Sequence, residues 1–302
     1  MIASNSPSGA KAPARVVSLV PSITESLFDL GLSDRLVGIT DYCVHPADGV
    51  RGLPRLGGTK NPRCDEIIAL RPDLVMANQE ENRAQDVVRL RAAGLQVWVT
   101  FPRTLRQALD VLWEIVRRFE ATAMSVRLLP LEHTLAWTRA AAGDARPVSV
   151  FCPIWREPPA GAGNAKSAWW MTINADTCVS DLLAVCGGRN VFAGRERRYP
   201  LAADLAQGGN GGGRTQSADG GERDVRYPRV TLDEIVAAQP EVILLPSEPY
   251  AFGEEDRAEW MRLGDLPAVR DDRVHLVDGS LLTWHGTRMA RALQEIPPLL
   301  AD

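Results

Sequence analysis

The sequence has no apolar run of 18 residues and no excess of positive charge. A membrane-spanning helix needs about 20 mostly apolar residues, so no membrane insertion is expected. The 34 lysines and arginines face 38 aspartates and glutamates, which gives a net charge of -4. Such a chain presents no cationic surface to a polyanion, and a nucleic-acid partner is therefore not expected.

Cysteine pairs at metal-binding spacing are also missing. The five cysteines are Cys43, Cys64, Cys152, Cys178 and Cys186. No two of them are two or three residues apart, which argues against a zinc knuckle or a CxxC redox centre. The sequence has neither a GxSxG elbow nor an HExxH helix, so we do not expect an enzyme or a catalytic cofactor. A metal-dependent hydrolase or redox protein using Cys43, His45 and His285 is the weakest alternative.

The N-terminus, MIASNSPSGAKAPA, has neither a basic start nor an apolar stretch of 7–15 residues. It lacks the pattern of a secretory signal peptide, and we expect residues 1–14 to be a disordered lead-in. Two interpretations stay open, a cytoplasmic protein or a recorded start that omits a leader.

Two regions of alternating strands and helices predict an α/β fold of two lobes with mostly parallel sheets. We expect an N-terminal lobe over 15–103, a helical segment over 104–145 and a C-terminal lobe over 146–302. Ser22 and Glu25 form the pattern of a capping box for the first helix. Within the helical segment, Pro130 should kink or split the second helix. Near 206–224 the chain is glycine-rich and reads as a disordered loop.

A helix-proline-strand unit occurs once in each lobe. The segment DEIIALRPDLVMANQE begins at Asp65, and DEIVAAQPEVILLPSE begins at Asp233, an offset of 168 residues without a gap. Two similar lobes predict a cleft between them, where ligands usually bind in two-domain proteins. Chance agreement between short apolar stretches is the alternative explanation.

Several motifs in order, RVVSLVPSITESLFDLGL, TDYCVHP, LPRLGGTKNP, CGGRNVFA, YPRVTLDEIVAAQPEVILL and DGSLLTWHGTR, resemble a known family. It is the family of substrate-binding proteins of ABC importers for vitamin B12 and iron chelates. The resemblance extends from Arg15 to the C-terminus. It implies two Rossmann-like α/β lobes bridged by a single long helix, a metal chelate as ligand and a membrane permease as partner.

The resemblance also implies two docking patches. In the B12 binders, an acidic residue that opens a helix in each lobe pairs with permease arginines. Here those places hold Asp65 and Asp233, each followed by a glutamate, Glu66 and Glu234. Carboxylates on both lobes would steer docking to a two-fold permease. The alternative is that they only stabilise the first turns of their helices through the helix dipole.

The B12 binders hold the corrin ring between aromatic side chains. Tyr42 and Tyr227 match two such positions, and Trp169 or Trp170 lies where a third aromatic is expected. A fourth family aromatic, a tryptophan, is replaced by Thr59, which leaves room for another chelate. Arg288 is a candidate for a carboxylate or phosphate of the ligand. Core packing of the tryptophans and an ordinary surface ion pair for Arg288 are the alternatives.

Metal-ligating side chains are present, but not at the spacing of a zinc site. The candidates are Asp41, Cys43, His45, Glu80, Glu248 and His285. A direct axial bond from His45 or His285 to the metal of a chelate is a further hypothesis, and hydrogen bonding alone is the alternative for a lone histidine.

The sequence thus predicts a monomeric substrate-binding protein that captures a metal chelate, foremost cobalamin or another corrinoid, for an ABC importer. Iron-siderophore or haem binding is one alternative, and a cytoplasmic chelate carrier or sensor is another. The family resemblance implies a periplasmic or extracytoplasmic location.

Overall fold

The computed structural model describes residues 11–143, 145–158, 168–196 and 225–301. Most of the predicted lead-in and the glycine-rich segment 206–224 lie outside these residues. The chain divides into two compact units. Unit 1 contains residues 1–134 and 284–290, and unit 2 contains residues 135–283 and 291–302.

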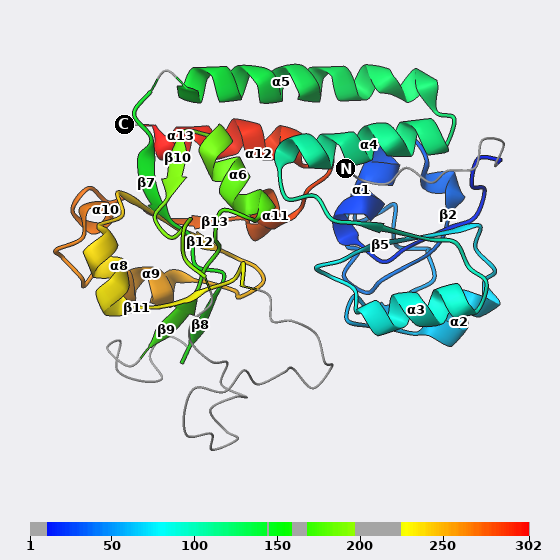
Figure 1. Cartoon of the computed structure of the whole chain (residues 1–302), viewed down its shortest axis with the longest axis horizontal. Helices are drawn as coiled ribbons and strands as arrows, with labels where there is room; N and C mark the ends of the chain where they lie inside the picture. The colour runs from blue at the N-terminus through cyan, green and yellow to red at the C-terminus, as the bar shows by residue number, and fades with distance from the viewer. Residues whose placement is uncertain (1–10, 144, 159–167, 197–224, 302) are drawn as a thin grey trace. The chain divides into compact units, whose positions relative to one another are not determined.

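Unit 1 is built on a parallel four-stranded sheet in the order β2-β1-β5-β6. Its strands are β1 Val16–Ser18, β2 Leu36–Ile39, β5 Leu74–Asn78 and β6 Val97–Thr100. Its helices are α1 Pro21–Asp29, α2 Cys64–Ala69, α3 Ala84–Ala92 and α4 Leu105–Arg118, with a short hairpin of β3 Gly57–Gly58 and β4 Asn61–Pro62. Figure 1 shows α2 and α3 together on one side of this sheet and α4 on the other. Alternate strand residues such as Val17 and Val75 pack with Ile67 of α2 and Leu90 of α3.

Unit 2 repeats this plan with a parallel sheet in the order β10-β7-β12-β13. Its strands are β7 Val148–Phe151, β10 Gly188–Asn190, β12 Val242–Pro246 and β13 Val274–Val277. Its helices include α6 Cys178–Val185, α8 Leu232–Ala238, α9 Glu254–Trp260, α10 Pro267–Arg270, α11 Gly279–Thr283 and α13 Pro297–Leu300. Because α2 precedes β5 and α8 precedes β12, the echo seen in the sequence corresponds to the same place in both sheets.

The helix α5, Ser125–Gly143, runs from unit 1 into unit 2, and Pro130 lies inside it. The helix α5 is not split at Pro130. The missing N–H of Pro130 leaves one helical hydrogen bond unmade, and the rest of the helix continues past it. The helix α12, Met289–Glu295, begins in unit 1 and ends in unit 2. No described helix is long and apolar enough to cross a membrane.

The expected capping box at the first helix is wrong. The N-cap of α1 is Val20, with Pro21 at the first turn, and no side chain caps the helix. Ser22 lies inside α1, where its buried hydroxyl has no partner among the described residues. Glu25 instead binds Arg288 of the segment 284–290. That segment was assigned to the C-terminal lobe by sequence, but these contacts place it in unit 1.

Candidate ligand-binding site

A small antiparallel sheet in unit 2, which the sequence analysis does not predict, carries a candidate site. It consists of β8 Trp155–Glu157, β9 Trp169–Met171 and β11 Arg229–Thr231, in the order β11-β9-β8. Side chains alternate between the two faces of a sheet, and cross-strand partners share a face. Trp155, Met171 and Arg229 therefore form one row, and Arg156, Trp170 and Val230 form a row on the opposite face.

The inner face of this sheet is part of the core of unit 2. Trp170 is only 2% exposed and its ring centre lies 5.2 Å from that of Trp260. The guanidinium of Arg156 lies 5.4 Å from the Trp170 ring and forms ion pairs of 3.1 Å with Asp256 and Glu259. Burial lowers the pKa of Arg156, but the two carboxylates outweigh it and raise that pKa. Trp170 is thus a core residue, which corrects the expectation that it binds ligand.

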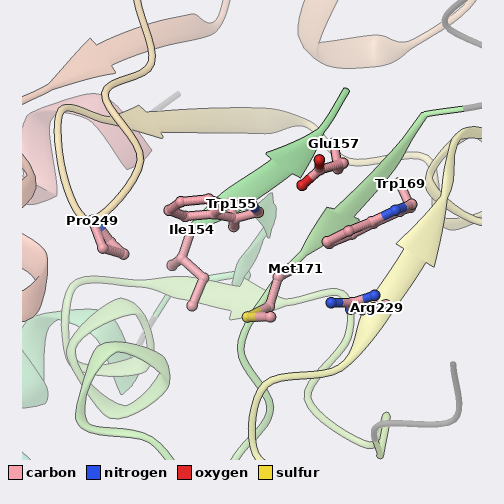
Figure 2. Close-up of a pocket in the computed structure, with 7 residues that line it drawn as sticks. All are labelled: Ile154, Trp155, Glu157, Trp169, Met171, Arg229 and Pro249. Atoms are coloured by element: carbon pink, nitrogen blue, oxygen red, sulfur yellow. The ribbon is translucent and has the colours of Figure 1, made fainter. Parts of the chain in front are cut away.

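The outer face carries Trp169 and opens into a pocket of about 230 Å³. Its lining residues are Ile154, Trp155, Glu157, Trp169, Met171, Arg229 and Pro249, as Figure 2 shows. Trp155 is 40% exposed and meets Tyr250 edge to face at 5.6 Å. The guanidinium of Arg229 lies 3.6 Å from the centre of the Trp169 ring. Two indoles, a thioether and an aliphatic side chain make this pocket suitable for a flat, mainly apolar ligand.

Tyr227 lies just before β11 and is half-buried. The guanidinium of Arg226 is 5.4 Å from its ring centre, so part of the ring is engaged within the protein. Tyr227 is not among the residues that line the pocket. Its predicted contact with ligand stays a prediction.

In unit 1 the loop that follows β2 presents side chains to solvent. Tyr42 is 63% exposed, and Val44 and His45 are also exposed. The His45 ring meets Trp284 edge to face, with ring centres 5.7 Å apart. Thr59, where the resemblance implies an aromatic residue, is half-buried, and its carbonyl oxygen accepts a hydrogen bond of 2.9 Å from Asn82.

Two of the predicted metal-directed side chains are buried and engaged. Cys43 is fully buried, and the hydroxyls of Thr24 and Thr40 lie 3.1 Å from its sulfur. Burial is the main reason that the pKa of the Cys43 thiol is raised, which keeps it protonated and a poor metal ligand. His285 is buried, and its Nε2 lies 3.2 Å from Nδ2 of Asn78 in a hydrogen bond.

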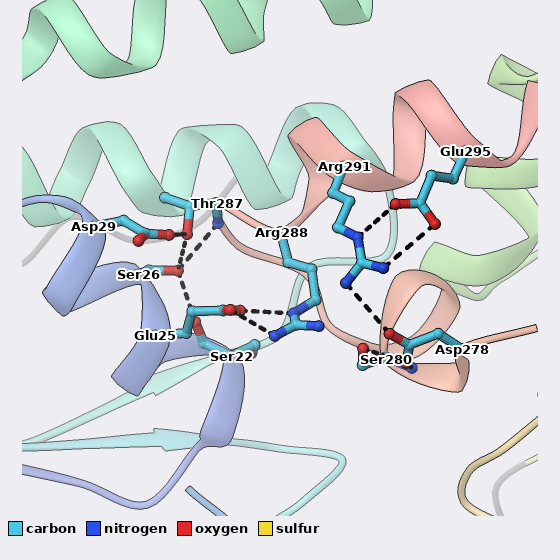
Figure 3. Close-up of polar contacts among 10 residues, drawn as sticks. All are labelled: Ser22, Glu25, Ser26, Asp29, Asp278, Ser280, Thr287, Arg288, Arg291 and Glu295. Atoms are coloured by element: carbon cyan, nitrogen blue, oxygen red, sulfur yellow. Dashed lines mark hydrogen bonds and ion pairs between the residues drawn. The ribbon is translucent and has the colours of Figure 1, made fainter. Parts of the chain in front are cut away.

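Arg288 is a structural residue rather than a surface group. Its Nε and Nη2 atoms donate to the two carboxylate oxygens of Glu25 at 2.8 and 2.6 Å. Figure 3 shows this pair beside Thr287, whose hydroxyl donates to Asp29. On its other side the guanidinium lies 4.7 Å from the Trp284 ring. Because Arg288 is buried, paired with Glu25 and close to the Trp284 ring, we correct the expectation that it binds an anionic group of the ligand.

The predicted metal ligands do not come together. Within the part of the chain that the structure describes, no three His, Cys, Asp or Glu side chains form a group that could hold a bare metal ion. Glu248 accepts a hydrogen bond of 2.6 Å from Thr283 in unit 2. Glu80 belongs to unit 1, where its backbone N–H donates to Asn78. The set of Cys43, His45, Glu80 and Glu248 is therefore not a metal centre.

The acidic candidates for docking open α2 and α8 as expected, but they differ in role. Asp65 and Asp233 are both exposed. Asp65 pairs with Arg89 at 2.7 Å, and Glu66 pairs with Arg63 at 2.7 Å. Glu234 closes a capping box with Thr231 and also pairs with Arg195. The free carboxylate surface is thus smaller than the four acidic residues suggest.

Three site residues were not found by sequence reasoning: Trp155, Arg229 and Trp284. The alternation of exposed Trp155 with buried Arg156 is a strand signal, but a run of three residues is too short to recognise. Trp284 directly precedes His285 in the motif DGSLLTWHGTR, but nothing in the local spacing shows that its ring meets His45. A surplus of tryptophan in the composition, eight in all, was the only sequence signal for these surfaces.

Comparisons with known proteins agree with this architecture. Residues 16–104 match the family described as periplasmic binding protein. The vitamin B12-binding protein of Vibrio cholerae is 23% identical over 93% of this chain and 87% of its own length. The corresponding protein of Yersinia pestis is 26% identical over 78% of this chain and 70% of its own.

Solved structures extend the likeness in fold to almost the whole chain. The periplasmic vitamin B12 binding protein BtuF of Vibrio cholerae has a TM-score of 0.72 at 22% identity, and covers 96% of this chain and 98% of its own. The periplasmic heme-binding protein RhuT from Roseiflexus sp. RS-1 has a TM-score of 0.67 at 22% identity, covering 97% and 98%. At this level of identity the likeness establishes the two-unit α/β fold.

Proposed function

We propose that this chain, a relative of the periplasmic binding proteins, is the substrate-binding protein of an ABC importer and captures cobalamin or another corrinoid. The observation that carries the proposal is the outer face of the small sheet in unit 2, where Trp155 and Trp169 line one pocket with Arg229. The names of the B12-binding relatives support the choice of ligand. No catalytic cofactor belongs to this function.

The physical basis of capture is area burial and stacking. An indole stacked on a flat conjugated ring contributes about 0.5–1.5 kcal/mol beyond the area that it buries. The guanidinium over Trp169 holds that ring in one orientation, which reduces the entropy lost when a ligand stacks on the pocket. Tyr42 offers a second exposed ring on unit 1.

Calorimetric titration with cyanocobalamin tests the proposal. We expect a dissociation constant below about 1 μM and a roughly tenfold loss of affinity in Trp169→Leu, which corresponds to about 1.4 kcal/mol. Trp137, on α5, is 78% exposed and lies outside the pocket, so Trp137→Leu is the matched control and should bind like the parent protein. Tyr42→Ala and Tyr227→Ala report separately on units 1 and 2. Equal affinity of Trp169→Leu and the parent would contradict the pocket assignment.

A haem or iron chelate is the second candidate ligand. Thr59 removes one aromatic that the B12 binders have, and heme-binding proteins share this fold. Titration with haemin under the same conditions separates the two candidates. Haemin binding without cyanocobalamin binding would transfer the proposal to iron chelates.

We further propose that a permease docks on the exposed carboxylates of Asp65 and Asp233, that the protein acts as a monomer, and that it works in the periplasm. Charge reversal in Asp65→Lys with Asp233→Lys should weaken binding to the permease in proteoliposomes and leave ligand affinity unchanged. Asp34 and Asp48 are also highly exposed aspartates of unit 1, so Asp34→Lys with Asp48→Lys changes the net charge by the same amount and is the matched control. Sedimentation of the pure protein tests the monomer.

A further inference from the structure

We propose that His45 binds the metal of the captured chelate directly, by giving an imidazole nitrogen to an open axial position. This inference rests on the proposed function, because it needs a flat chelate on the exposed loop of unit 1. The expected ligand is then a planar macrocycle whose metal carries at least one displaceable axial group.

The loop that carries His45 is anchored on both sides of the exposed residues. Cys43 points inward to Thr24 and Thr40, and its carbonyl oxygen accepts a hydrogen bond of 2.9 Å from Arg55. The backbone N–H of Val50 donates to the carbonyl oxygen of Pro46 at 3.1 Å. The backbone that carries the exposed side chains of this loop is thus held in place by hydrogen bonds. A site for a rigid ligand needs such a fixed backbone.

The ring of Trp284 lies against the imidazole of His45. The two rings meet at an interplanar angle of 68°, and Trp284 is held from its other side by the guanidinium of Arg288. Among the described residues, none forms a hydrogen bond or ion pair with the imidazole of His45. Neutral imidazole is the commonest protein ligand of transition metals, and an exposed, oriented ring is available for that role.

The other three histidines are less suited. His285 is buried and bonded to Asn78, and His275 lies on β13, where burial and the charge of Arg273 lower its pKa. His133 is exposed on α5, and no aromatic contact of its ring is seen in the described residues. His45 alone combines exposure with Tyr42 on the same loop and Trp284 against its ring.

The step is a ligand exchange at the metal. The bond between cobalt and an axial water breaks, a bond between cobalt and the His45 nitrogen forms, and the water leaves. No electron is transferred, and the imidazole is neutral when it binds. A corrinoid whose axial positions are both blocked by cyanide still stacks on the aromatic side chains but cannot make this bond.

Two forms of one macrocycle test the inference, diaquocobinamide and dicyanocobinamide. In the parent protein we expect diaquocobinamide to bind at least tenfold more tightly, with a shift of its visible absorption bands. His45→Gln should lose the preference and the spectral shift, and keep its affinity for dicyanocobinamide within about twofold. His133→Gln replaces another exposed histidine and should behave like the parent. Thermal unfolding of His45→Gln checks that the fold is retained.

The outcomes separate the two proposals. If His45→Gln binds dicyanocobinamide and also keeps the preference for diaquocobinamide and its spectral shift, His45 does not bind the metal. Corrinoid capture would still stand in that case. If the parent protein binds neither cobinamide nor cyanocobalamin, the corrinoid function fails first, and the bond from His45 to cobalt fails with it.

Discussion

Asp73 and Glu241 perform the same task in the two units. Asp73 accepts hydrogen bonds of 2.9 Å from the backbone N–H groups of Ala14 and Arg15, just before β1. Glu241 accepts one of 2.9 Å from the backbone N–H of Ser149, at the start of β7. The two residues are separated by the same 168 positions as Asp65 and Asp233. Each parallel sheet is thus tied at the beginning of its first strand by an acidic residue. That residue follows Arg71-Pro72 in unit 1 and Gln239-Pro240 in unit 2.

The carboxylate of Glu241 gives stability a dependence on acid pH. Burial raises its pKa, but hydrogen bonds from Ser149 and the guanidinium of Arg146 outweigh this and lower the pKa to about 2. Because the pKa of Glu241 is lower in the folded state than the usual value of 4.5, the ionised carboxylate stabilises the fold above pH 4.5. This stabilisation is lost as the pH falls toward 2. The side chain of Glu241 is 24% exposed, so solvent screens part of the interaction. We expect the free energy of unfolding to fall by on the order of 2 kcal/mol over this pH range.

Urea unfolding of the parent protein and of Glu241→Gln between pH 5 and about pH 2.5 measures this dependence. The variant should be less stable at pH 5, and the difference should shrink as the pH falls. A constant difference between the two proteins across this range is inconsistent with the assigned pKa shift.

The second residue after α2 has a backbone conformation that favours glycine. Arg71 has a φ of 46°, and Gln239, its equivalent after α8, has the same value. A Cβ atom in this left-handed region is strained, so Arg71→Gly should stabilise unit 1 by about 0.5–1 kcal/mol. Arg71→Ala retains the Cβ and should give no such gain. Thermal and urea unfolding of both variants measure the difference, and equal stability of the two would count against strain at this position.

The ion pair between Glu25 and Arg288 connects two segments 263 residues apart in sequence. Both side chains are largely buried, so Glu25→Gln leaves a charge without its partner and should lower the free energy of unfolding by about 3 kcal/mol or more. Replacing both residues, by Glu25→Gln with Arg288→Met, should recover part of that loss. A double-mutant cycle in urea gives the coupling energy.

The pair of Arg51 and Asp48 is the control for this experiment. Its side chains are almost fully exposed, and exposed ion pairs contribute at most about 1 kcal/mol. Asp48→Asn should therefore change stability little. A loss as small as this in Glu25→Gln would show that the buried pair does not hold segment 284–290 to α1.

The cysteines should differ sharply in reactivity. Cys178 is partly exposed at the start of α6, whereas the other four are buried. Burial raises the pKa of Cys152 and Cys186 to about 12, which leaves almost no thiolate at pH 8. A chromogenic aromatic disulfide should label one thiol quickly in the native protein and five after unfolding. Cys178→Ser should remove the fast phase, and persistence of that phase in the variant would contradict the assignment.

The local pattern of the sequence determined much of the fold. Alternating strands and helices predicted two α/β lobes with mostly parallel sheets, and the sheets β2-β1-β5-β6 and β10-β7-β12-β13 confirm this. The echo at an offset of 168 residues predicted equivalent helix-proline-strand units, and α2-β5 and α8-β12 confirm it. These features depend on residues close together in the chain, so composition and spacing are enough to reveal them.

Tertiary structure alone decided which side chains form the candidate site. Adjacent residues of a strand point to opposite faces, so Trp169 and Trp170 could not both line one site. Only the packing of Arg156 and Trp260 against the inner face shows that Trp170 is the buried one. In the same way, Glu25 suited a helix cap by local spacing, yet its partner is Arg288. A buried guanidinium and a buried carboxylate must pair with each other wherever they lie in the chain, and that requirement has no signature in the sequence around either residue.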